Sequence, residues 1–112
     1  MSQNEIEQIE VSIEEAKQVV AMGELARKMA DNPTFKTLVL EGYFRDEAAR
    51  LALLVSDPQM APHRELIMRG LDSIGGFKRY LSTKIQMGDI ARREIAEGET
   101  ELDDLRQEDG AE

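Results

Sequence analysis

Apolar residues recur along the chain at three- and four-residue steps, the spacing that places side chains on one face of an α-helix. No stretch alternates apolar and polar residues as a half-buried strand does, and no hairpin turn signal occurs. The pattern therefore predicts an all-α fold. We expect three helices joined by short connections, at residues 13–31, 33–55 and 62–106.

Capping residues and prolines set these predicted boundaries. Ser12 and Glu15 have the spacing of a capping box, in which a Ser hydroxyl and a Glu carboxylate satisfy free N–H groups at a helix start. Asn32 can cap the second helix, and Pro33 suits its first position because proline has no N–H to leave unpaired. The segment 56–62 contains two prolines and is the clearest loop.

The second predicted helix is the most apolar part of the chain, and its apolar positions are broader than one stripe. We therefore expect residues 33–55 to form the central and most buried helix. A length of 112 residues suits one domain. We place this domain at residues 12–107, with acidic segments at 1–11 and 108–112.

The third predicted helix carries an apolar residue or glycine at every seventh position from Ile67 to Leu102, a repeat typical of a helix packed along a partner helix. As one helix, residues 63–106 would be about 66 Å long, and a hairpin of the first two helices would cover about half of it. The uncovered stripe predicts a coiled-coil-like homo-oligomer or helical bundle. The residues expected at its interface are Ile67, Ile74, Leu81, Ile85, Ile95 and Leu102. Two alternatives remain open at Gly75-Gly76: a break that would allow a closed four-helix monomer, or a close crossing of helices.

Charge is distributed unevenly. The net charge is −9, but residues 1–15 carry −5, residues 16–62 balance, residues 63–93 carry +4 and residues 94–112 carry −8. Bases beside an aromatic side chain could bind single-stranded nucleic acid by phosphate pairing and stacking. The candidate contacts are Arg64, Arg69, Lys78, Arg79, Tyr80, Lys84, Arg92 and Arg93. The alternatives are a solvated helix face and pairing with the acidic ends of a neighbouring chain.

Candidate catalytic chemistry is sparse. The chain has no cysteine, which excludes disulfides, thiolate metal sites and cysteine nucleophiles. His63 is the only histidine, and no orienting partner can be named for it. We therefore predict no catalytic residue, no cofactor and no metal site. No apolar run is long enough to span a membrane and no signal-peptide pattern is present, so we expect a soluble protein that is not exported.

Four short strings look like those of small acidic all-helical proteins of tailed bacteriophages, encoded near head and portal genes. They run from Val11 to Lys17, Asn32 to Lys36, Leu40 to Glu47 and Gln86 to Gly88. The resemblance implies a non-enzymatic structural, assembly or adaptor protein in the host cytoplasm or the virion, with itself and another assembly protein as partners. It transfers no catalytic residue. Two alternatives stand beside it: a single-stranded nucleic-acid-binding phage cofactor that uses residues 64–93, and an acidic inhibitor of a host protein.

Overall fold

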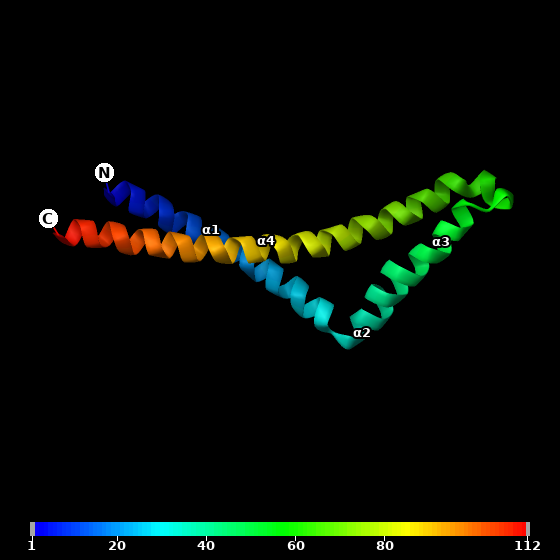
Figure 1. The fold of residues 1–112 in the computed structure, drawn as a ribbon, viewed down its shortest axis with the longest axis horizontal. Helices are drawn as coiled ribbons and strands as arrows, with labels where there is room; N and C mark the ends of the chain where they lie inside the picture. The colour runs from blue at the N-terminus through cyan, green and yellow to red at the C-terminus, as the bar shows by residue number, and fades with distance from the viewer. Residues whose placement is uncertain (1, 112) are drawn as a thin grey trace. The chain divides into compact units, whose positions relative to one another are not determined.

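The computed structural model describes residues 2–111, which are almost entirely helical and contain no strand (Figure 1). This confirms the predicted all-α fold with a long C-terminal helix. Two segments are helical but not α-helical: a π-helix, η1, between α2 and α3, and a 3₁₀-helix, η2, between α3 and α4. In chain order the elements are α1 (Ser2–Asp31), α2 (Pro33–Phe35), η1 (Lys36–Glu47), α3 (Ala48–Val55), η2 (Pro58–His63) and α4 (Arg64–Ala111).

Both long helices extend further than the sequence pattern predicted. α1 begins at Ser2 rather than at residue 13, and α4 continues to Ala111 rather than ending at 106. The expectation that the acidic ends lie outside the helical domain is therefore wrong for the described residues. Ile6 is the reason at the N-terminal end: it continues the apolar spacing of α1 and is buried, although glutamates surround it in the sequence.

α4 is continuous through Gly75-Gly76, so the predicted alternative of a break there is wrong. A close helix crossing at this point is also absent among the described residues. A Cβ atom added to Gly75 or Gly76 would meet nothing within 4 Å.

Residue contacts divide the chain into two compact units. Unit 1 consists of residues 1–25 with 84–112, and unit 2 consists of residues 26–83. α1 and α4 each contribute residues to both units. The single predicted domain over 12–107 is thus organised as two clusters of contacts.

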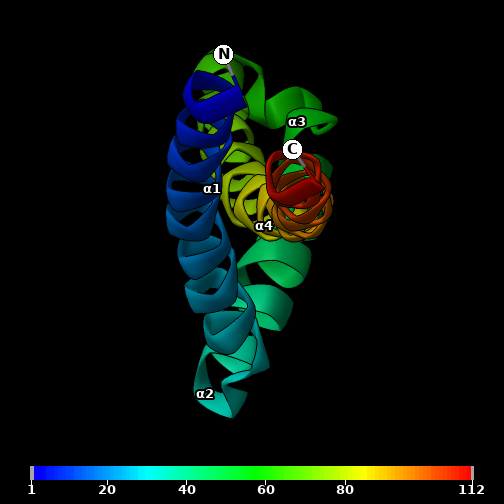
Figure 2. The same ribbon diagram turned by 90° about the vertical axis from the view of Figure 1, so that its left-hand side faces the viewer.

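Unit 1 is an antiparallel pair formed by the first part of α1 and the last part of α4, with both chain ends at the same end of the pair (Figures 1 and 2). Its buried cluster contains Ile6, Ile13 and Leu102. Around this cluster lie three half-buried side chains: Ile9, Ile95 and Leu105. These positions are three and four residues apart on α1, and seven and three residues apart on α4, which is coiled-coil spacing.

The helices of unit 1 approach most closely at two glycines. A Cβ atom added to Gly23 would lie 2.8 Å from the Lys84 carbonyl oxygen and 2.9 Å from the Gly88 Cα. A Cβ on Gly88 would lie 3.0 Å from the Gly23 Cα. Backbone atoms cannot move aside as a flexible side chain can, so this contact requires glycine on both helices.

Unit 2 contains the end of α1, the elements from α2 to η2, and the first part of α4. Phe77 of α4 makes edge-to-face contacts with Phe35 and Phe44, with ring centroids 6.4 and 5.4 Å apart. No residue of Pro33–Val55 is buried, so the expectation that this is the most buried helix is wrong. Its apolar positions are broader than one stripe, so packing on one face leaves Leu38 and Leu53 largely exposed.

Side-chain caps begin two of the helices of unit 2, α2 and η2. The Asn32 carboxamide oxygen accepts hydrogen bonds from the N–H groups of Thr34 and Phe35, at 3.0 and 3.1 Å, as the sequence predicted. The Asp57 carboxylate accepts a hydrogen bond of 2.9 Å from the Gln59 N–H at the start of η2. Both caps satisfy N–H groups that have no partner inside their own helix.

We predict that Gly23→Ala destabilises the protein although alanine is the better helix former. Alanine gains about 1 kcal/mol in helix propensity, but forcing the two backbones apart costs about 1–3 kcal/mol. Urea unfolding followed by circular dichroism measures the difference. Gly76→Ala is the matched control, because its Cβ enters open space and should add about 0.5–1 kcal/mol. Equal stabilisation by both substitutions would contradict the close approach.

We also predict that Ile6→Ala lowers the free energy of unfolding by about 2 kcal/mol, the usual cost of truncating a buried aliphatic side chain. Val11 is the control on the same helix, because its side chain is 57% exposed. Val11→Ala should change stability by less than about 0.5 kcal/mol. If Ile6→Ala were as neutral as Val11→Ala, the first turns of α1 would not belong to the folded core.

Candidate interaction surfaces

The six residues predicted to form an oligomer interface lie in contacts within the chain. Ile67, Ile74, Leu81 and Leu102 are buried, and Ile85 and Ile95 are half-buried. In unit 1 the first turns of α1 cover Ile95 and Leu102. At Ile95 and Leu102 the stripe therefore does not need another chain to cover it, contrary to the prediction, because α1 begins at Ser2 and is longer than the predicted helix.

The eight predicted nucleic-acid contacts are divided between the two units. Arg64, Arg69, Lys78, Arg79 and Tyr80 belong to unit 2, whereas Lys84, Arg92 and Arg93 belong to unit 1. Two of these bases are already paired within the chain: Arg69 with Glu65 at 2.9 Å, and Arg92 with Glu24 at 2.9 Å. Lys84 is half-buried where α4 meets Gly23.

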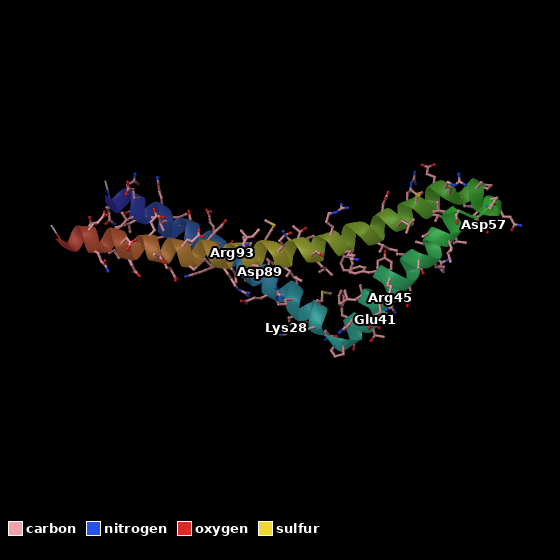
Figure 3. All side chains as sticks on the ribbon, viewed as in Figure 1. Lys28, Glu41, Arg45, Asp57, Asp89 and Arg93 are labelled. Carbon is pink, nitrogen blue, oxygen red and sulfur yellow. The ribbon has the colours of Figure 1, made fainter. Side chains whose placement is uncertain are left out.

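Four of the predicted bases form no ion pair with any side chain that the structure describes. They are Arg64, Lys78, Arg79 and Arg93, the last labelled in Figure 3. Lys78 and Arg79 adjoin each other, but Arg64 lies about 21 Å away along α4 at 1.5 Å per residue. The predicted contacts in unit 2 that lack an ion-pair partner among the described residues therefore all lie along one helix.

The two units differ strongly in charge. Unit 1 contains 16 of the 23 acidic residues and 5 of the 14 basic ones, which gives it a net charge of −11. Unit 2 contains the remaining 7 acids and 9 bases and carries +2. The predicted alternation along the sequence thus becomes, after folding, one acidic unit and one slightly basic unit.

Two adjoining hollows form a groove along one side of the helix pair in unit 1, which we call the seam groove. They share Ser12, Ala16 and Glu94. Apolar and small residues contribute much of the lining: Ile9, Ile13, Ala16, Val19, Met87, Ile90, Ala91 and Gly98. Polar residues complete it: Gln8, Ser12, Glu15, Glu94, Glu97 and Glu101.

The seam groove contains four carboxylates and no base. Across the helix pair, Arg92 of α4 pairs with Glu24 of α1 at 2.9 Å and Arg106 pairs with Glu10 at 3.1 Å, and neither arginine lines the groove. No base among the described side chains pairs with the groove glutamates. An apolar surface flanked by unpaired negative charge is suited to a helix with an apolar stripe and basic flanks.

A second groove lies in unit 2, between η1–α3 and the first part of α4; we call it the unit 2 groove. Its lining is mostly apolar: Leu38, Gly42, Tyr43, Glu47, Leu51, Gly70 and Ile74. At Gly70 a Cβ atom would lie 3.1 Å from the Leu51 Cδ1, so a larger residue there would narrow the groove. Arg50 donates a hydrogen bond of 3.0 Å to Glu47 and lowers the pKa of that carboxyl group.

Three leucines of unit 2 are largely exposed. Leu38 of η1 is 70% exposed, Leu53 of α3 is 74% exposed and Leu66 of α4 is 69% exposed. Sequence reasoning missed these residues because it assigned apolar runs to the core. For Leu66 the sequence contains an indication of exposure, because this residue lies outside the seven-residue repeat that contains Ile67 and Ile74.

Among residues 2–111, no group of three or more histidine, aspartate or glutamate side chains is arranged to hold a metal ion. Within the same range, no helix combines the length and apolar character needed to cross a bilayer. Comparison of the chain with protein-family models, curated proteins and solved structures finds no match.

Proposed function

We propose that this protein is a non-enzymatic helical assembly or adaptor protein that works as a homo-oligomer. The supporting observation is the exposed apolar surface of unit 2, where Leu38 borders an open apolar groove and Leu66 is 69% exposed. Burying a leucine side chain contributes about 1.5–3 kcal/mol, so contact with another chain would stabilise these positions. The function is thus binding through helical faces rather than chemistry at a site.

The setting proposed for this assembly is a phage particle or its formation in the host cytoplasm. The resemblance to small acidic helical phage proteins supports this setting. Another protein of the same assembly is the expected second partner. The unequal charges of the two units support a contact with direction, in which one face of a copy meets a different face of the next.

We predict that wild-type protein at micromolar concentration has a native mass of more than one chain, and that Leu38→Glu with Leu66→Glu weakens the association and lowers that mass. Each substitution puts a charge where the contact buries apolar surface. Light scattering after gel filtration measures the mass, and circular dichroism checks the helix content. The matched control is Gln59→Glu with Ser82→Glu, which adds two acids at other exposed positions of unit 2. A monomeric wild-type protein would overturn the proposed function.

A second candidate function is binding of single-stranded nucleic acid. It is favoured by Lys78 and Arg79, which adjoin each other without an ion-pair partner among the described residues, and by the neighbouring Tyr80, which is 52% exposed. Nucleic-acid binding is disfavoured because Lys78 and Arg79 are only two adjoining bases and because unit 1 is strongly acidic.

For this candidate we predict salt-sensitive binding of a fluorescent oligonucleotide that Lys78→Ala with Arg79→Ala weakens. Losing two phosphate contacts should reduce the slope of log affinity against log salt by about 1.4. Fluorescence anisotropy at several salt concentrations measures this slope. Lys28→Ala with Lys36→Ala removes the same charge outside α4 and is the control. Equal effects of the two pairs, or no binding at low salt, would remove this candidate.

A third candidate is inhibition of a basic host protein by the acidic unit 1. Its support is the charge of −11 together with the unpaired carboxylates of the seam groove. This candidate differs from self-assembly in two respects. The occupant of the seam groove would come from another protein, and the native mass of the isolated chain would be that of a monomer.

A further inference from the structure

The chemistry of the seam groove defines what can occupy it. Its half-buried and partly exposed apolar side chains, Val19, Met87 and Ile90, leave apolar surface in contact with solvent. Glu94 and Glu101 stand seven residues apart along its α4 side and lack an ion-pair partner among the described residues. A complementary segment therefore needs apolar or small residues at helical spacing, with positive charge beside them.

A second unit 1 cannot satisfy this requirement. Each unit 1 carries −11, so pairing two of them would bring like charges together along the whole contact. Like-charged groups placed opposite each other across an interface cost several kcal/mol. The occupant must come from a surface with the opposite charge.

The first half of α4 has such a surface. Positions 64, 68, 71, 75 and 78 follow three- and four-residue steps and therefore share one side of the helix. Met68 is 45% exposed and Leu71 is half-buried, and Gly75 leaves open space for a close approach. Bases stand at both ends of this side. We call this surface the basic face: Arg64, Met68, Leu71, Gly75, Lys78 and the adjoining Arg79.

The two surfaces also have equal lengths. The seam groove extends along α4 from Met87 to Glu101, and the basic face extends from Arg64 to Lys78. Each covers fourteen residue steps, or about 21 Å at 1.5 Å per residue. Apolar character, charge and length are thus all complementary.

We infer that the seam groove of one copy binds the basic face of a second copy, so that copies associate head to tail. This inference rests on the proposed homo-oligomer and adds a charged contact to the apolar one proposed at Leu38 and Leu66, which lie outside both surfaces. The two surfaces come from different units, so an open row of copies has a free groove at one end and a free basic face at the other until a ring closes. Because the charges are exposed, the association should weaken as the salt concentration rises.

Charge exchange tests this contact. The groove variant is Glu94→Lys with Glu101→Lys, and the face variant is Lys78→Glu with Arg79→Glu. In either variant alone, the changed residues face groups of the same charge on the next copy. Sedimentation should therefore give a dissociation constant for self-association at least tenfold higher than that of the wild type. Mixed one to one, the two variants restore opposite charges in both contacts and should associate again.

Glu7→Lys with Asp103→Lys is the matched control. It makes the same change of charge as the groove variant, at exposed positions of unit 1 that do not line the seam groove. It should leave the wild-type association nearly unchanged. Circular dichroism of all variants verifies that the helices are retained.

The outcomes separate the two proposals. A wild-type chain that stays monomeric overturns both the homo-oligomer and this contact. A wild-type oligomer that the groove variant affects no more than the control overturns only the contact. Loss of association in both variants without recovery on mixing also overturns it, because the groove and the basic face would then not be partners. Loss in each variant with recovery on mixing supports it.

Discussion

The contact between Gly23 and Gly88 constrains everything else in unit 1. Small side chains such as Ala16 and Ala91 are buried in the same helix pair. Small residues bury little apolar area, so larger side chains further along the pair, around Leu102, must supply the remaining hydrophobic stabilisation. The two glycines thus bury little apolar area themselves, but their close contact fixes the distance and the register between the two helices.

That register also determines how the charges are arranged. With Gly23 opposite Gly88, Arg92 reaches Glu24 and Arg106 reaches Glu10. These two arginines are therefore paired away from the seam groove. The unpaired carboxylates of the groove follow from the helix pairing, because a shift of one helix along the other would exchange these partners.

The sequence could predict which residues of α4 are buried, because a seven-residue repeat such as that of Ile74 and Leu81 depends only on local helical geometry. It could not predict their partner. Ile6 stands among glutamates, so the composition of its segment resembles that of a solvated tail. Gly88 occupies a position of the seven-residue repeat but has no apolar side chain, so the repeat does not indicate a helix contact there. The π-helix η1 and the seam groove depend on contacts between residues far apart in sequence, so no local pattern indicates them.

The opposite charges of the two units place a limit on how copies of this chain can associate. Contacts between two acidic units are repelled, so the favourable contacts join unlike surfaces and have a direction. A directional contact between identical chains either closes into a ring or continues as a filament, depending on the rotation from one copy to the next. In the contact that we propose, exposed carboxylates would provide much of the attraction, so ionic strength would control the growth of either assembly. For an assembly protein, such a contact allows growth to begin and stop without any change in the fold of the chain.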